Sequence, residues 1–213
     1  MTGNLTIPDF QKMIRQALAD VTARAGEFSE LDAVIGDGDH GEAIVTALNA
    51  IAKVSNADDA TGKDFKTLLG DMGFGVMMET SGSTSTLLGG LLLGMSDGVP
   101  SGSANLDAAQ VKGMFKGGLE GVQKNTKAMP GDKTMMDALY PAVQAMQECA
   151  SDDIAVVLKA GADAAQKGAE ATVQMKANFG RARNYGEKSV GHADSGASSW
   201  ACMFGAFAAA LAE

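Results

Sequence analysis

The sequence is poor in the residues that mark several large classes of protein. Its two cysteines, Cys149 and Cys202, have no CxxC or other metal-binding spacing, and two are too few for a disulfide framework. We interpret them as thiols of the protein core in a reducing compartment. Only 4 of the 213 residues are proline and 5% are aromatic, whereas 46% are hydrophobic. The composition therefore favours a single folded domain, residues 1–213, and argues against disorder.

Positive charge is also scarce, with 17 Lys and Arg against 26 Asp and Glu and a formal net charge of −9. Nucleic acids and anionic membranes bind positive surfaces, so we expect neither as a partner. Any phosphate that the protein binds needs another source of neutralising charge. No uncharged run is long enough to span a bilayer, and residues 1–10 lack the features of a signal peptide. These absences indicate a cytoplasmic protein.

Apolar residues recur at helical spacing along most of the chain, and runs of strand-forming residues are few. An α/β sheet is therefore disfavoured, and we expect an all-α fold, a single bundle or barrel of about eight helices. Segments rich in Gly, Ser, Asp or Pro separate the predicted helices, and the longest of these connections are 96–106 and 178–195. The predicted helices lie near residues 8–28, 40–55, 63–79, 84–95, 107–124, 134–149, 152–177 and 196–212.

The densest chemistry lies in residues 31–42, where four carboxylates stand beside three glycines and a histidine. Carboxylate oxygens suit a hard divalent cation, and glycines let the backbone turn tightly enough for Asp37 and Asp39 to converge on it. We therefore predict a magnesium site. The alternative is a solvated acidic loop that caps the helix beginning at His40.

Two other motifs overlap this acidic segment. Gly36, Gly38 and Gly41 match the dinucleotide-binding fingerprint, but a pyrophosphate on that loop would meet Asp37 and Asp39 directly. An EF-hand does not fit either, because Gly41 occupies a ligand position and the terminal Glu is absent. The metal-binding interpretation is the one that remains.

Three further segments carry candidate binding groups. The run of hydroxyls and glycine at 80–86 leads into an apolar helix, so its backbone N–H groups could bind an anion, although ordinary helix capping is the alternative. Residues 130–134 precede another helix and are a weak binding signal on their own; the alternative is a turn with Asp132 or Thr134 as the helix cap and Lys133 in solvent. Residues 180–196 collect arginines, a histidine and an aspartate, enough for one phosphate or nucleotide or simply a charged surface loop.

Together, these motifs resemble a known family. The motif Leu-Asp-x-x-Ile-Gly-Asp-Gly-Asp-His-Gly at 31–41, Gly-Asp-Lys-Thr at 131–134, and Gly-Arg-Ala followed by Tyr-Gly-Glu-Lys-Ser-Val-Gly-His-x-Asp-x-Gly at 180–196 are similar to the nucleotide-binding L subunit or L domain of dihydroxyacetone kinases, the DhaL or DAK2 type. The resemblance spans nearly the whole chain. It implies an antiparallel eight-helix barrel that holds ADP or ATP at one end through two Mg²⁺ ions.

The resemblance also implies roles for individual residues but assigns no catalytic residue within this chain. Asp32, Asp37 and Asp39 would bind the metal ions. The residues expected to contact the nucleotide are His40, Gly41, Glu42, Ala43, Ser83, Thr84, Thr126, Met135, Arg181, Asp194, Ser195 and Gly196. Two positions depart from the family pattern, because Thr86 and Ser195 stand where relatives usually have proline. The contacts from the 80–86 run are affected most by this loss of rigidity.

The activity implied is phosphoryl transfer to a small ketose that a separate K-type subunit holds. The sequence leaves open which ketose is used, whether a triose or a tetrulose. It also leaves open whether ATP exchanges freely or bound ADP is rephosphorylated by a phosphocarrier protein. A non-catalytic module that binds Mg²⁺ and nucleotide and docks on a regulator is the main alternative, and a plain helical scaffold is a third.

Overall fold

Helices make up nearly all of the regular structure in residues 3–212, the part of the chain that the computed structural model describes. Within this part, nine α-helices are present, so the expected all-α fold is confirmed. Their bounds are α1 (Ile7–Ala23), α2 (Ala25–Ile35), α3 (His40–Ser55), α4 (Phe65–Glu79), α5 (Ser83–Asp97), α6 (Ala108–Gln123), α7 (Met136–Glu148), α8 (Ile154–Ala171) and α9 (Ser195–Leu211).

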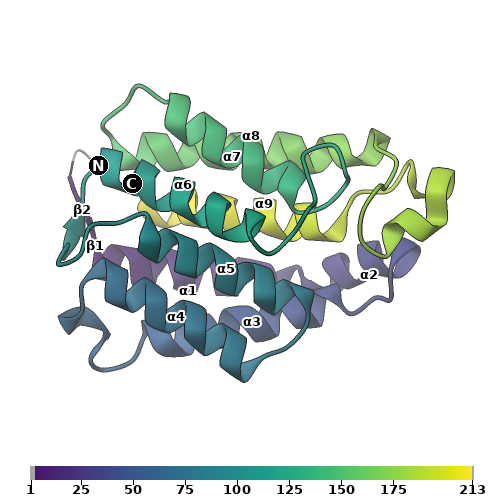
Figure 1. The fold of residues 1–213 in the computed structure, drawn as a ribbon. Coiled ribbons are helices and arrows are strands. Elements are labelled where there is room, and N and C mark those ends of the chain that lie inside the picture. Colours follow the sequence, from purple (N-terminus) through teal and green to yellow (C-terminus); the bar gives the residue numbers. More distant parts are fainter. Residues whose placement is uncertain (1–2, 213) are drawn as a thin grey trace.

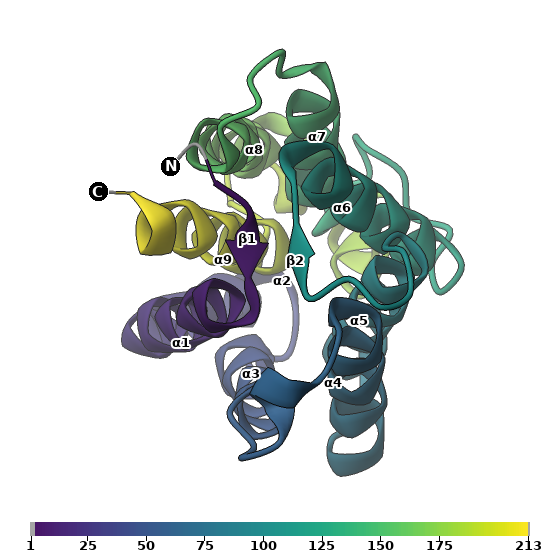
Figure 2. The same cartoon turned by 90° about the vertical axis from the view of Figure 1, so that its left-hand side faces the viewer.

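Eight of these helices form a closed antiparallel barrel (Figures 1 and 2). Each helix from α3 to α9 packs against the next, and α1 closes the ring between α9 and α3. The apolar stripe of each helix faces the centre, where the largest buried side chains include Trp200, Phe115 and Phe204. The short helix α2 stands outside the ring and covers part of one end (Figure 1).

The segment 8–28, expected as one helix, is two helices in the structure. Helix α1 begins with a capping box in which Thr6 and Asp9 satisfy each other's backbone N–H groups, and it ends before Arg24. Arg24 has φ −109° and ψ 8°, which turns the chain into α2. Because α2 extends to Ile35, Asp32 lies on a helix rather than in the turn where the sequence placed it.

A seam of glycines joins α5 to α6. Gly90 and Gly94 on α5 and Gly98 just after it face Gly113, Gly117 and Gly121 on α6, and successive glycines are four positions apart along the chain. A Cβ atom at Gly94 would overlap the carbonyl oxygen of Gly117, so the two backbones touch directly. The low aromatic content therefore reflects close packing of helix backbones.

The two ends of the barrel differ. At one end, the two-residue strands β1 (Leu5–Thr6) and β2 (Asn105–Leu106) pair antiparallel, and α9 ends nearby (Figure 2). The opposite end carries α2 and the connections 36–39, 80–82, 124–135 and 172–194 (Figure 1). The last of these contains the 3-10 helices η2 (Thr172–Gln174) and η3 (Ala182–Ser189); a third, η1 (Ala60–Gly62), lies between α3 and α4.

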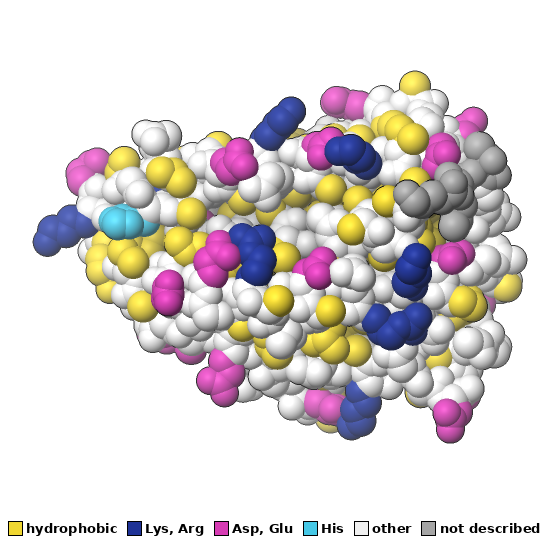
Figure 3. All heavy atoms as spheres, turned by 180° about the vertical axis from the view of Figure 1, so that it is seen from behind, with side chains coloured by type: hydrophobic (Ala, Val, Ile, Leu, Met, Phe, Trp, Pro, Cys, Tyr) yellow, Lys and Arg dark blue, Asp and Glu magenta, His cyan; other side chains and the backbone are white. Residues whose placement is uncertain are grey.

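The surface shows no concentration of one charge on the face drawn in Figure 3. Lysine and arginine side chains there are scattered among acidic and hydrophobic ones. Among residues 3–212, none of the helices combines the length and the apolar character needed to cross a membrane.

Candidate functional site

A pocket of about 380 Å³ opens at the end of the barrel that lies opposite the paired strands. Its walls come from the connections 36–39, 80–82, 124–135 and 172–194 and from the helix ends beside them. The residues that line it are Asp32, Ile35, Gly36, Asp37, Asp39, His40, Ala43, Ser81, Gly82, Ser83, Thr84, Leu87, Lys133, Thr134, Met135, Phe179, Gly180, Arg181, Ala182, Asp194, Ser195, Gly196 and Trp200.

The three predicted metal ligands meet on one wall. Asp32 lies in the last turn of α2, and Asp37 and Asp39 lie in the turn that leads to α3. One carboxylate oxygen of each lies within 4.8 Å of the other two. Opposite ligands of a single Mg²⁺ ion are separated by about 4.2 Å, twice the usual bond length. The cluster thus has the size and the donor atoms that divalent cations require.

The backbone holds this cluster in shape. Gly38 has φ +81°, which favours glycine, and its N–H donates to the Asp32 carboxylate at 2.7 Å. The Ser195 hydroxyl donates to the other Asp32 oxygen at 3.3 Å. Asp32 is therefore fixed by the turn and by the start of α9, while Asp37 and Asp39 remain exposed to solvent.

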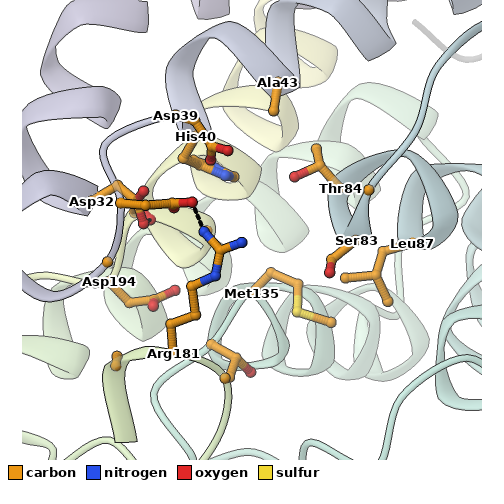
Figure 4. Close-up of a pocket in the computed structure, with 18 of the residues that line it drawn as sticks. Asp32, Asp39, His40, Ala43, Ser83, Thr84, Leu87, Met135, Arg181 and Asp194 are labelled. Carbon is orange, nitrogen blue, oxygen red and sulfur yellow. Dashed lines mark hydrogen bonds and ion pairs between the residues drawn. The ribbon is translucent and has the colours of Figure 1, made fainter. Parts of the chain in front are cut away.

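Arg181 reaches across the pocket and forms an ion pair with Asp37 (Figure 4). The two residues belong to segments more than 140 positions apart, since Arg181 lies between α8 and α9. Both side chains are well exposed, so the pair adds little to stability. Its importance is geometric, because it places a guanidinium beside a candidate metal ligand, where a phosphate could accept hydrogen bonds from it.

His40, at the first position of α3, packs against α9. Its Nε2 atom lies 2.7 Å from the hydroxyl oxygen of the buried Ser199. Burial lowers the pKa of His40, and the negative charges of Asp32 and Asp39 oppose this only in part. A largely neutral imidazole is therefore held at the pocket wall.

The hydroxyl-rich run faces the acidic cluster from the other side of the pocket (Figure 4). Gly82 is the N-cap of α5 with φ +93°, and Ser83 and Thr84 form the first turn of that helix. The backbone N–H groups of a first turn have no partner within the helix and carry its positive dipole end. Both predicted phosphate contacts thus lie at a helix terminus suited to anions.

Asp194, Ser195 and Gly196 form the start of α9 beneath the acidic cluster. The Asp194 carboxylate caps α9 by accepting from the N–H of Ala197 at 2.7 Å. Burial, helped by the charges of Asp137 and Asp32, raises the pKa of Asp194 to about 7. A Cβ at Gly196 would lie 3.4 Å from the backbone nitrogen of Met135, so this turn packs on the start of α7.

Three residues expected at the nucleotide do not line the pocket. Gly41 is buried against α2, where a Cβ would overlap the carbonyl oxygen of Ala25. Glu42 is exposed on α3 and is not among the lining residues. Thr126 lines a neighbouring hollow that shares Ser83 with the pocket. The other predicted residues, Ala43 and Met135 included, are all in the lining.

The alternative interpretation of residues 130–134 placed Lys133 in solvent, and the structure contradicts that placement. Its side chain is only 1% exposed, and its ammonium group donates to backbone carbonyls beneath the pocket. The sequence carried no signal for this placement, because backbone acceptors have no signature in the residue types around them. Phe179 and Trp200 were missed as lining residues for a similar reason, since only the folded chain brings them to the pocket.

The fold and this pocket together define a DAK2 domain, and the chain belongs to that family: the family model described as the DAK2 domain matches residues 34–209. Among curated relatives, the ADP-binding subunit DhaL of the PEP-dependent dihydroxyacetone kinase 1 of Listeria innocua is 35% identical over 83% of this chain and 82% of that protein. The corresponding DhaL subunit of Escherichia coli is 30% identical over 91% of this chain and 92% of its own length. The resemblance to the L subunit is thereby confirmed.

Solved structures agree on the fold. A crystal structure of the dihydroxyacetone kinase of C. freundii matches with a TM-score of 0.72 and 25% identity, over 93% of this chain and 34% of that enzyme. This chain thus spans about a third of that enzyme. The same kinase in complex with AMP-PNP and Mg²⁺ matches with a TM-score of 0.71 at 24% identity, which bears on the fold alone.

Proposed function

We propose that this protein is the nucleotide-binding subunit of a kinase for dihydroxyacetone or a related small ketose. The observation that supports the proposal is the pocket itself, which has a volume of about 380 Å³. Three carboxylates on one of its walls face the N-terminus of α5 on the other. A divalent cation on the first and phosphate groups on the second would fill it. The curated names of the DhaL relatives, which call them ADP-binding subunits, support the same assignment.

In this proposal, Asp32, Asp37 and Asp39 hold two Mg²⁺ ions. Magnesium supplies the positive charge that offsets the phosphates, which a protein of net charge −9 does not otherwise provide. The three carboxylate oxygens, which lie within 4.8 Å of one another, are the donors that would hold both ions. The Arg181 guanidinium is within reach of the same phosphates once it leaves Asp37.

The remaining proposed contacts divide between the two ends of the nucleotide. Ser83 and Thr84 bind phosphate oxygens through the first turn of α5. Thr126 and Met135 lie toward the base, since the hollow that Thr126 lines continues the pocket along α5. The segment of His40, Gly41, Glu42 and Ala43, with the Asp194, Ser195 and Gly196 turn, completes the site. Because Gly41 and Glu42 do not line the pocket, they would act through the shape of α3 rather than by contact.

The proposed reaction needs a partner that carries the acceptor, for which we propose a K-type, ketose-binding subunit. We also propose that residues 1–213 form one domain and that the protein works in the cytoplasm. The DhaL relatives are named as subunits of PEP-dependent kinases. A phosphocarrier protein that transfers a phosphoryl group to permanently bound ADP would fit that dependence. We propose this bound-ADP cycle for the present chain rather than free exchange of ATP.

Calorimetric titration with Mg²⁺ and ADP tests the binding site. Asp37→Asn should weaken the Mg²⁺-dependent affinity for ADP at least tenfold, since it removes one of three charged ligands. Asp163→Asn, on an exposed salt bridge of α8, is the matched control and should bind as the wild type does. Equal affinity of Asp37→Asn and the control would refute the metal assignment.

A reconstituted assay tests the reaction and the cycle. Purified chain is mixed with its K-type partner, dihydroxyacetone or erythrulose, and ATP. No turnover without a phosphocarrier, followed by turnover when the phosphocarrier and its phosphate donor are added, is the expected result. Turnover with ATP alone would contradict the bound-ADP cycle. Tight nucleotide binding with no phosphoryl transfer under either condition would favour the regulatory module instead.

A further inference from the structure

Lys133 is a buried lysine that the proposed chemistry does not use. Its Nζ atom lies 2.9 Å from the carbonyl oxygen of Thr172 and 3.1 Å from that of Met175. It also lies 2.6 Å from the carbonyl oxygens of Ser189 and His192. One ammonium group thus meets four carbonyls, two from each end of the same connection between α8 and α9.

The position is costly for a lysine, which argues that the side chain is needed there. Lys133 has φ +61°, and among the described residues 3–212 it alone combines a positive φ with a side chain. Such a backbone is disfavoured in residues other than glycine because the Cβ atom crowds the neighbouring carbonyl oxygen. Burial also disfavours the charged ammonium and lowers the pKa of Lys133. Glycine would avoid both costs but would remove the ammonium donor that these four carbonyls share.

The four carbonyls lie at the neck of a loop, residues 176–188, that we call the Arg181 loop. Further hydrogen bonds draw the neck together: Gly191 N–H donates to the Val173 carbonyl at 2.7 Å, and Ala177 N–H donates to the Ser189 hydroxyl oxygen at 2.9 Å. Most of the loop is exposed, and it brings Phe179, Gly180 and Arg181 to the pocket. Lys133 is the charged group at the centre of this neck.

We propose that Lys133 is a positioning residue whose ammonium group closes the neck of the Arg181 loop and so holds Arg181 over the nucleotide pocket. The effect on the neck follows from the contacts of Lys133 alone. The effect on nucleotide affinity rests on the proposed function.

Limited trypsin digestion measures the loop directly, because Arg181 and Arg183 are exposed cleavage sites within it. In Lys133→Met, which keeps the length of the side chain but not its charge, cleavage at these two sites should be at least tenfold faster, as judged by mass spectrometry. Lys112→Met is the matched control, since Lys112 donates to the single carbonyl of Cys149 at the other end of α7. It should leave cleavage in the loop unchanged.

Titration with Mg²⁺ and ADP supplies the second readout. Lys133→Met should weaken binding at least tenfold, and Lys112→Met less than twofold. If the wild type itself fails to bind, the proposed function is wrong, while the trypsin result still decides whether the clamp exists. Unchanged cleavage at Arg181 and Arg183 in Lys133→Met would overturn the clamp. Faster cleavage with unchanged ADP affinity would overturn its role in positioning.

Chemical rescue separates the ammonium from general stability. Lys133→Ala removes the atoms that propylammonium contains, and adding this ion should restore slow cleavage and ADP affinity, whereas tetramethylammonium, which has no N–H donor, should not. Equal effects of the two ions would refute the role of the donor. If Lys133→Met does not fold, Lys133→Gly, which relieves the positive φ, replaces it in both measurements with the same expected and contrary outcomes.

Discussion

The glycine seam between α5 and α6 makes a quantitative prediction at Gly94. The substitution Gly94→Ala would place a Cβ atom on the carbonyl oxygen of Gly117, 2.8 Å from the Cα of Gly121 and 2.9 Å from its nitrogen. All three obstacles are backbone atoms of α6, so no side-chain rotation can relieve them. The two helices would have to separate, and α5 carries Ser83 and Thr84 to the pocket at its other end.

The magnitude follows from two opposing terms. Overpacking a close contact costs about 1–3 kcal/mol, and backbone contacts on this scale belong at the upper end of that range. Alanine recovers up to about 1 kcal/mol through its higher helix propensity. The net destabilisation of Gly94→Ala should therefore be about 2 kcal/mol. For a chain of this size, that lowers the melting temperature by about 4–8 °C.

Gly205→Ala is the matched control, because Gly205 lies inside α9 and a Cβ there would meet nothing within 4 Å. This variant should be stabilised by up to about 1 kcal/mol through the higher helix propensity of alanine, with no steric cost. Its melting temperature should therefore rise by about 2–4 °C. Thermal unfolding followed by circular dichroism compares the two variants with the wild type. A Gly94→Ala protein that melts at or above the wild-type temperature would refute the close-approach argument.

Two further predictions concern the pocket. Gly41→Ala should push α3 away from the Ala25 carbonyl and weaken Mg²⁺-dependent ADP binding several-fold in calorimetry, and unchanged binding would contradict it. For Asp194, a folded-state pKa of about 7, above its ordinary value, means that apo stability falls as pH rises from about 4 to 7. Asp194→Asn keeps a capping oxygen and should therefore raise the apo melting temperature at pH 8 but not at pH 4; an equal change at both would show that titration is not the cause.

Much of the barrel could be predicted from the sequence because its signals are local. Apolar periodicity and the Gly- and Asp-rich connections indicated the helix positions, and the capping residues Asp64, Asp107 and Asp153 stand where α4, α6 and α8 begin. The break between α1 and α2 at Arg24 could not be predicted, because no proline lies next to it and the apolar spacing on either side is compatible with one continuous helix. Because the break at Arg24 was not predicted, α2 was not predicted either, and Asp32 was placed in a turn instead of on that helix.

The site was harder to predict than the fold, for a physical reason. Asp37 and Asp39 lie in one short motif, so their convergence follows from a tight turn. Arg181 meets Asp37 only because the barrel closes, and His40 meets Ser199 for the same reason. The partners of Lys133 are carbonyl groups, which every residue possesses, so no spacing of residue types distinguishes them.

The placement of the chain ends has a consequence for how this domain can be joined to others. The first strand begins at Leu5 and α9 ends at Leu211, both at the end of the barrel away from the pocket (Figure 1). The 17 residues of α9 span about 25 Å at 1.5 Å per residue. A linker that carried a fused acceptor domain back to the pocket of its own barrel would need at least about eight extended residues. Tags or surface tethers attached at the same ends would leave the pocket open.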